Sequence, residues 1–342
     1  MKEALKSLRI VAVLVTLTLF MGAGQVVAAE EVFEFKISID TAPSHPRNQG
    51  LVIFMEELQK RSHGKLVPKF FHSGQLYKDA HVAKALRTGT VEMAVPGTWV
   101  LEGVDSNINM FGMPMFFGQT LKATLNTADG DFGKAATKVL AKKLGAICLG
   151  RFFYAGEDTN FTTKKKITRM EDFKGLKIRH PGGSVQEARL NSFGASAVFM
   201  AFPDVPMALM QGTIDGINSN IIAVESSKLY EAGVKYAFQW RAGQSLYAPL
   251  VSLKFWNRLT PDLQKMFMQL WDEVVTRQRE IAMKDLEEDK KFLEGKGMEF
   301  FQPSDQELAR MRGVFMTTQD NLAKELKYDP AIIQLAKKGL GI

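Results

Sequence analysis

Cysteine is nearly absent from this chain of 342 residues, which contains only Cys148. A single cysteine cannot form an intramolecular disulfide, so the fold must rely on its hydrophobic core, which a chain of this length can build. The run "AICL" at 146–149 is typical of a buried strand, and this favours a structural thiol over a reactive one. Because Cys148 lies far from the N-terminus, it offers no site for lipid attachment there.

Sequence signatures of catalysis, metals and nucleotides are also missing. The histidines have none of the spacings typical of metal sites; they are His45, His63, His72, His81 and His180. The stretch "GGSVQ" at 182–186 lacks the trailing glycine of a nucleophile elbow, and no phosphate-binding loop occurs. The basic run at 164–166 is interpreted as a solvated loop, because a nucleic-acid site needs a broad basic face. We therefore expect no metal, no cofactor, no catalytic residue and no nucleic-acid partner.

Only one long apolar run occurs, at 10–21, and it follows the basic residues Lys2, Lys6 and Arg9. Small residues ending at Ala29 come next, so the pattern predicts a secretory signal peptide that comprises the first 29 residues. A membrane anchor is the alternative, but the run is shorter than the ~20 residues that a spanning helix needs. We expect a soluble, exported protein in a bacterial periplasm, where a mild excess of positive charge favours small anionic ligands.

The remaining sequence alternates between strand and helix patterns, which is typical of an α/β fold. Two segments, "ALRTGTVEMAV" at 85–95 and "ALMQGTIDGI" at 208–217, share a helix–glycine–strand ending. This similarity predicts two lobes of like topology, with coincidence as the alternative. No linker rich in glycine, serine and proline divides the chain, so we expect several chain crossings between the lobes, as at a hinge.

Three local patterns give specific expectations. A strand is expected at 147–153. A long amphipathic helix is expected at 261–295, with Thr260 as its N-cap. A further helix is expected at 305–326, where Ser304 and Glu307 have the spacing of a capping box.

The stretch "GLKIRHPGG" at 175–183 carries the strongest indication of a binding site. Lys177 and Arg179 share one face of a short strand, and the proline and glycines that follow end it. A guanidinium is therefore carried to a turn at the end of a strand. The planar guanidinium group can donate two parallel hydrogen bonds to the two oxygens of a carboxylate, and lysine cannot form this bidentate pair. A structural ion pair with a nearby acidic residue is the alternative.

Several segments together resemble the substrate-binding proteins of tripartite ATP-independent periplasmic (TRAP) transporters, the DctP family. Besides "GLKIRHPGG", they include "HPRNQGLVIFMEELQKRSHGKLVPKFF" at 45–71, "PMFF" at 114–117, "GASAVFMAFPDVPMALMQGTIDGINSN" at 194–220 and "FWNRLTPDLQKMF" at 255–267. The resemblance implies a two-lobe periplasmic-binding-protein fold with a hinge cleft and a long helix that spans the lobes. It implies the lobe boundaries as well: lobe I at 30–153 plus about 244–282, and lobe II at 154–243 plus about 283–342.

The resemblance also implies ligand-binding residues in lobe II. Arg179 would clamp the carboxylate of the ligand, and Phe202 would pack against the ligand, with a simple core position as its alternative. One of Asn218, Ser219 and Asn220 would reach the cleft, and the sequence leaves the choice open.

In lobe I, Thr98 and Trp99 fall where relatives contact the far end of the ligand, with a core position as the alternative for Trp99. His45 lies in a loop that can border the cleft, although a surface loop is the preferred interpretation. Many relatives carry a second arginine in the loop after the strand that ends near Phe153, which the resemblance places at 154–160 here, and Asp158 falls at about that position. An acidic residue there predicts a monocarboxylate, whose hydroxyl or amine groups Asp158, Glu157 or Asn160 could hold.

The predicted function is that of a periplasmic receptor, not an enzyme. It would capture a small organic acid by closing its hinge and deliver it to TRAP membrane subunits, as a monomer and without ATP. One alternative is a ligand-binding receptor for a periplasmic sensor, which the sequence does not separate from a transport receptor. An exported enzyme on the same scaffold is a weaker alternative, since no nucleophile–base pair or metal set is visible.

Overall fold

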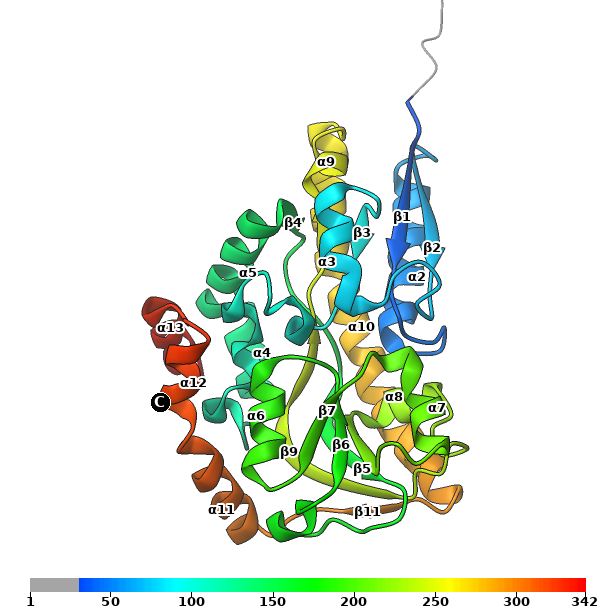
Figure 1. Ribbon diagram of the computed structural model, residues 1–342. Helices are drawn as coiled ribbons and strands as arrows, with labels where there is room; N and C mark the ends of the chain where they lie inside the picture. Colours follow the sequence, from blue (N-terminus) through cyan, green and yellow to red (C-terminus); the bar gives the residue numbers. More distant parts are fainter. Residues whose placement is uncertain (1–30) are drawn as a thin grey trace, which may run out of the picture. The chain divides into compact units, whose positions relative to one another are not determined.

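The computed structural model describes residues 31–342, so the predicted signal peptide lies outside the described residues. Residues 33–342 form one compact unit that contains two β-sheets (Figure 1). Each sheet and the helices that cover it form one lobe, which confirms the α/β class. Within the described residues, no helix combines the length and the apolar composition that crossing a bilayer requires.

The first sheet has five strands. Their order is β2 (Leu66–Phe71), β1 (Phe33–Ser38), β3 (Met93–Ala94), β10 (Leu250–Ser252) and β4 (Ala146–Cys148). β1 pairs in parallel with β2 and β3, whereas β10 returns antiparallel from much later in the chain. In β1, Phe33, Phe35 and Ile37 are buried and alternate with Glu34 and Lys36, which is the period of a strand with one face on the core.

The second sheet has six strands. Their order is β11 (Glu299–Phe301), β9 (Tyr236–Tyr247), β5 (Phe153–Thr162), β8 (Gly216–Ser219), β6 (Lys177–His180) and β7 (Ser196–Phe199). β6 pairs in parallel with both β7 and β8, and β5 is antiparallel to β8 and β9. The chain passes between the sheets three times: from β4 to β5, from β9 to β10, and from β10 to β11.

Helices cover both sheets and connect their strands. The α-helices are α2 (Pro46–Arg61), α3 (Asp79–Thr88), α4 (Leu121–Asp129), α5 (Asp131–Leu144), α6 (Ser184–Ser192), α7 (Val205–Met210), α8 (Ile221–Ser226), α9 (Leu253–Trp256), α10 (Pro261–Gly295), α11 (Asp305–Met316), α12 (Gln319–Glu325) and α13 (Pro330–Leu340). The 3-10 helices are η1 (Thr98–Leu101), η2 (Ser106–Gly112), η3 (Pro114–Phe116), η4 (Met170–Phe173) and η5 (Phe202–Asp204).

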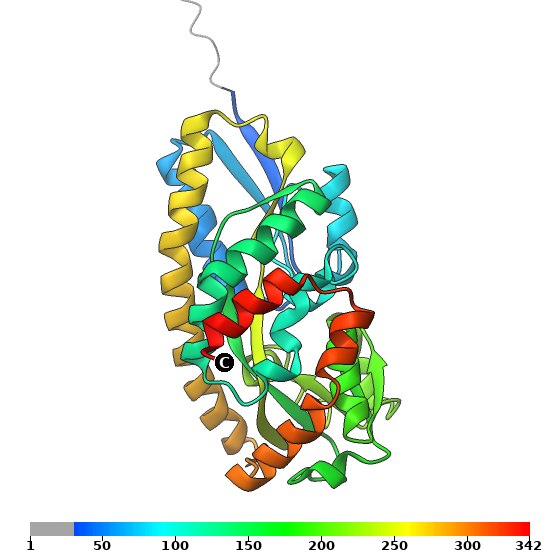
Figure 2. The same cartoon turned by 90° about the vertical axis from the view of Figure 1, so that its left-hand side faces the viewer.

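Helix α10 has the bounds that the sequence predicts, and it links the two lobes. The Thr260 hydroxyl accepts a hydrogen bond from the Leu263 amide, which confirms the predicted N-cap. The helix packs on α2 of the first lobe and on β5 and α8 of the second. In Figure 2 it extends along one side of both sheets. Its buried face carries Phe267, Trp271 and Val274, which have the spacing of one helix face.

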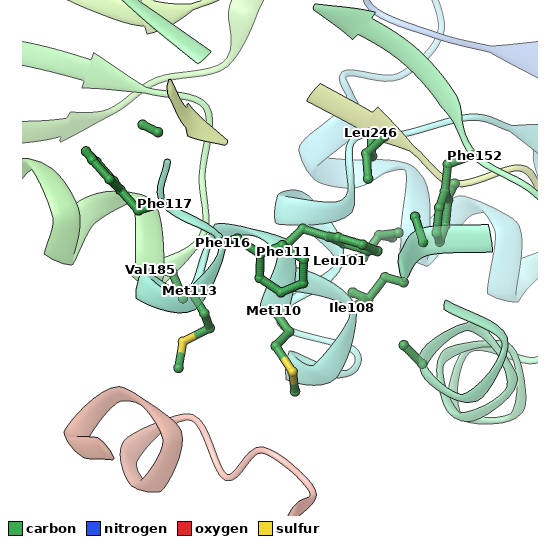
Figure 3. Packing of buried hydrophobic residues seen from close by; sticks show 14 of the residues in the cluster. Leu101, Ile108, Met110, Phe111, Met113, Phe116, Phe117, Phe152, Val185 and Leu246 are labelled. Carbon is green, nitrogen blue, oxygen red and sulfur yellow. The ribbon is translucent and has the colours of Figure 1, made fainter. Parts of the chain in front are cut away.

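The hydrophobic core is continuous between the lobes. Phe111 in η2 contacts the rings of Phe116, Phe132 and Phe152 at centroid distances of 5.6, 5.0 and 5.5 Å (Figure 3). The same cluster includes residues of both sheets, for example Leu250 of β10 together with Ile178 and Phe238 of the second sheet. The lobes are therefore joined by packed side chains as well as by chain crossings.

Three sequence expectations differ from the structure. The strand expected at 147–153 is two strands in different sheets, and the loop expected at 154–160 belongs to β5, whose pairing with β9 shifts register twice. The helix expected at 305–326 is interrupted between α11 and α12. Ser304 caps α11, but the Glu307 carboxylate accepts from the Met170 amide, so only half of the capping box forms. Cys148 is half-buried in β4 rather than fully buried.

Candidate ligand-binding site

A cavity lies between the lobes, at the ends of strands from both sheets. The empty space within it is about 670 Å³ when the part open to solvent is included. From the first lobe it is lined by Asp40, Thr41, Arg47, Asp79, Ala80, Trp99 and Val100. From the second lobe and the end of β9 it is lined by Asp158, Arg179, Pro181, Gln186, Ala201, Phe202, Asn218, Ser219, Asn220, Ala223, Ser245 and Tyr247.

Arg179 is held rigidly by its own lobe. It lies on β6, which pairs with β7 on one side and β8 on the other, and it is 2% exposed. Its Nε donates to the Met200 carbonyl at 2.9 Å, and Nη1 donates to the Asn218 carbonyl at 3.4 Å. Its guanidinium lies 5.6 Å from the ring centroid of Phe202. The position at the end of β6 therefore fixes the fork while leaving Nη2 without a hydrogen bond to any residue in 31–342.

The electrostatic state of Arg179 is unusual for a buried arginine. No carboxylate in the described part of the chain forms an ion pair with it, so the structural ion pair considered above is absent from residues 31–342. Burial lowers the pKa of Arg179 to about 10, an effect that Asp40 and Tyr247 partly oppose. The guanidinium is still charged at neutral pH. An anion that entered the cavity would find a positioned, poorly solvated partner.

The three neighbouring candidates on β8 and at the start of α8 all line the cavity, but two of them have structural partners. The Asn220 side chain caps α8, accepting from the Ala223 amide at 2.8 Å and donating to the Ser245 hydroxyl at 3.2 Å. Asn218 Oδ1 accepts from Arg189 at 3.2 Å, while its buried Nδ2 has no partner among residues 31–342. Ser219, which is half-buried, lies between them.

Asp158 lines the cavity, but its charge is compensated. Arg189 on α6, which is fully buried, donates from Nη2 to Asp158 Oδ2 at 2.7 Å and from Nη1 to the Ala242 carbonyl at 2.8 Å. The sequence-based argument, in which Asp158 itself repels a second carboxylate, therefore does not hold. Neither Glu157 nor Asn160, the other two residues proposed to hold polar groups of the ligand, lines the cavity.

A network of charged residues on the first lobe was not predicted from the sequence. Arg47 is fully buried near the start of α2 and donates to Asp40 at 2.7 Å and to Asp79 at 2.5 Å. All three residues line the cavity. Burial raises the pKa of Asp79, and Arg47 acts against that rise. The one sequence signal for this network is the position of Asp40 just beyond the end of β1, since ligands of α/β sheets bind at the ends of strands.

The aromatic wall of the cavity consists mainly of Tyr247 and Trp99. Tyr247 ends β9 and packs against Arg47 at 4.6 Å and edge-on against Trp99 at 5.4 Å. Thr98 and His45, both named as candidates from the sequence, are buried and do not line the cavity. His45 is not in a surface loop: its Nδ1 accepts from the Arg47 amide at 3.1 Å and so caps α2.

Direct contacts join the two lobes through residues that do not line the cavity. The Glu102 carboxylate, which follows η1, accepts from the Ser184 amide at 3.0 Å and from its hydroxyl at 2.5 Å, at the start of α6. Lys78 donates to both oxygens of Asp204 at 2.8 Å. These contacts define a closed arrangement of the lobes around the cavity.

The arrangement is suited to holding a solute. Among residues 31–342, no group of three or more histidine, cysteine, aspartate or glutamate side chains could hold a metal ion. Apart from Arg179, each charged side chain that lines the cavity has an ion-pair partner among residues 31–342. Two lobes with a cavity and a buried guanidinium group between them are typical of two-lobe solute receptors.

The comparison with known families gives the same class. The chain belongs to the bacterial extracellular solute-binding proteins of family 7, DctP, whose family model matches residues 37–325. The C4-dicarboxylate-binding periplasmic protein DctP of Rhodobacter capsulatus is 28% identical over 321 residues, which cover 93% of this chain and 95% of that relative.

Solved structures share the fold. The sugar acid binding protein DctPAm of Advenella mimigardefordensis, in complex with galactonate, has a TM-score of 0.84 at 23% identity and covers 90% of this chain and 99% of its own. A TRAP periplasmic solute binding protein from Shewanella oneidensis with bound succinate has a TM-score of 0.83 at 24% identity, with 91% and 99% covered. These likenesses confirm the two-lobe periplasmic-binding fold.

Proposed function

We propose that this protein is a periplasmic receptor that captures a small organic acid and delivers it to a TRAP membrane permease. One observation carries the proposal: Arg179 is buried at the cavity and no carboxylate of residues 31–342 pairs with it. A ligand carboxylate would accept two parallel hydrogen bonds from such a fork. The names of the relatives support the class of ligand, since they bind a C4-dicarboxylate, galactonate or succinate.

The proposed mechanism is hinge closure. The lobes would be 30–153 plus about 244–282 and 154–243 plus about 283–342, which agrees with the placement of β10 in the first sheet and β11 in the second. Closure would bring Glu102 onto the start of α6 and exclude water from Arg179. A ligand shifts this equilibrium only through contacts that it makes better in the closed form, and the Arg179 clamp provides such a contact. The closed form would then be recognised by the permease.

The test is a thermal-shift screen of the mature protein, refolded after denaturation to remove any carried-over ligand. The panel holds mono- and dicarboxylates, with neutral sugars as contrast. A ligand at about 100 times its Kd stabilises by about 2.7 kcal/mol, which is readily detected. We expect carboxylates to bind to the native protein and not to Arg179→Ala, with Arg179→Lys retaining only part of the affinity.

The matched control is Arg277→Ala, which removes an exposed arginine from α10 and should leave binding unchanged. Removing one partner of a buried charge pair costs roughly 2–5 kcal/mol, which is about 30-fold to several thousandfold in affinity. Binding of neutral sugars alone, or carboxylate binding that persists in Arg179→Ala, would show that Arg179 has a structural role only. Uptake of the identified acid by cells that express the matching permease, lost in Arg179→Ala, would establish the transport role. Light scattering would test the expected monomer.

A further inference from the structure

The charges that line the cavity can be grouped by their ion pairs. On the first lobe, Arg47 pairs with both Asp40 and Asp79, so this group carries a net charge of −1 when both carboxyl groups are ionised. On the second lobe, Asp158 is neutralised by Arg189, which leaves the single positive charge of Arg179. The cavity therefore has one cationic wall and one anionic wall, contributed by different lobes.

The anionic wall is buried and rigid, so its charge acts through a medium of low polarity. Arg47 is fully buried, and Asp40 and Asp79 are 9% and 7% exposed. Arg47 also donates to the Val95 carbonyl at 3.0 Å and to the Thr41 hydroxyl, which fixes its fork in place. The guanidinium therefore cannot turn toward a ligand without leaving its two carboxylates. An interaction between charges in such a site is much stronger than in water.

We propose that the cavity selects monocarboxylates whose far end carries a hydrogen-bond donor, an ammonium or a hydroxyl group, and that the wall of Asp40, Asp79 and Arg47 disfavours a second carboxylate. The inference rests on the proposed function, since it places the ligand carboxylate on Arg179. The donor end then meets the carboxylate oxygens of Asp40 and Asp79 on the opposite lobe. A ligand with both groups contacts the two lobes at once and so stabilises the closed form.

The net charge of the cavity predicts different affinities for ligands of equal length. When Asp40 and Asp79 are both ionised, as at the pH 8 of the experiment below, the charges around the cavity sum to zero: −1 from the first-lobe wall, 0 from Asp158 with Arg189, and +1 from Arg179. A dicarboxylate brings −2 and places one charge against the anionic wall. An amino acid with a terminal ammonium brings 0 and places opposite charges against both walls. A hydroxy acid should bind with intermediate affinity, because a hydroxyl group donates a hydrogen bond without carrying charge.

The experiment compares matched ligands by calorimetry at pH 8, with the native protein and its variants. One set is succinate, 4-hydroxybutanoate and 4-aminobutanoate, and a second set has one more carbon; gluconate and glucarate form a polyhydroxy pair. Within each set we expect the dicarboxylate to bind at least tenfold more weakly than the ligand with a donor end, a difference of about 1.4 kcal/mol. A dicarboxylate that binds as tightly as its partners would overturn the inference.

The decisive variant is Asp79→Asn, which removes one charge from the wall and can keep the hydrogen bonds that Asp79 Oδ2 accepts from Arg47 and the Gly97 amide. We expect the dicarboxylate to bind more tightly to this variant, and the preference for donor ends to fall at least fivefold. A gain in affinity cannot arise from misfolding. Asp40→Asn tests the same wall independently. Asp272→Asn changes the net charge equally at an exposed surface pair and should alter nothing.

Two failures remain distinguishable. If no carboxylate binds, or if binding persists in Arg179→Ala, the proposed function fails and this inference fails with it. If carboxylates bind through Arg179 but Asp79→Asn and Asp40→Asn leave the order of ligands unchanged, the receptor stands and only the role of the first-lobe wall is refuted.

Discussion

Replacing Arg189 by glutamine should destabilise the protein strongly, although Arg189 does not line the cavity. Its side chain is 1% exposed and donates to Asp158 at 2.7 Å, to the Ala242 carbonyl at 2.8 Å and to Asn218 at 3.2 Å. The substitution removes these bonds and leaves the Asp158 carboxylate without its cation. Breaking a buried ion pair by removing one partner costs about 3–5 kcal/mol.

The chain supplies a control pair of the same residue types at the same distance in a different environment. Arg151 pairs with Asp272 at the same distance of 2.7 Å, but the two side chains are 29% and 68% exposed. A solvated pair contributes about 0–1 kcal/mol, so Arg151→Gln should change the free energy of unfolding by no more than that. Both pairs join an arginine to an aspartate at the same distance, so burial is the main difference that the comparison tests.

The assay is urea denaturation followed by tryptophan fluorescence at pH 7.5, with the native protein and both variants. Adding Asp158→Asn to Arg189→Gln should recover part of the loss, because the uncompensated carboxylate is then gone. If Arg189→Gln lowers the free energy of unfolding by less than about 1 kcal/mol, or by no more than Arg151→Gln does, the expectation is refuted. The Arg189–Asp158 pair would then not stabilise the protein as a buried ion pair.

Three further substitutions probe other features. Burial raises the pKa of Glu157 from 4.5 to about 7, so the stability that this group contributes is present below pH 4.5 and lost as the pH rises through about 7; thermal melts should show Glu157→Gln more stable than the native protein at pH 8 but not at pH 4.5. A methyl group on Gly216 would lie 2.2 Å from the Phe161 carbonyl, so Gly216→Ala should cost about 1–3 kcal/mol in urea denaturation. Glu102→Ala removes a contact between the lobes without touching the cavity, so calorimetry should show ligand affinity lowered by about 5- to 30-fold, a loss of roughly 1–2 kcal/mol.

The sequence predicted those helices and strands whose caps, flanking residues and apolar faces all lie within one short segment. The helix at 261–295 has its cap, its first-turn proline and a continuous apolar face within the segment itself, and its bounds are confirmed. The strand that carries Arg179 is bounded by glycines and a proline, and the structure places it at 177–180. β5 was missed because two register shifts interrupt the alternation of buried and exposed residues. Asp158 lies within that irregular stretch.

The predicted site residues come mainly from the second lobe, whereas the charged residues of the first lobe were missed. Arg47 lies near the start of a helix, where a charged side chain normally faces solvent. Its burial depends on Asp40 and Asp79, which are 7 and 32 residues away in sequence. No periodic pattern encodes a pairing over such separations, since only the folded chain brings the three side chains together. Arg189 was missed for the same reason, because its partner Asp158 is 31 residues away.

The balance of charge around the cavity connects stability to function. Arg47 and Arg189 each have carboxylate partners within their own lobe, so their burial is compensated whether the lobes are apart or together. Of these three arginines, Arg179 is the one without a carboxylate partner among residues 31–342, and closing the lobes removes water from it. Closure without a ligand is thus opposed by the desolvation of one guanidinium, while contacts such as Glu102 with Ser184 favour it. The carboxylate of a ligand compensates the charge of Arg179 and so offsets the cost of its desolvation. For this reason we expect binding and closure to be a single event.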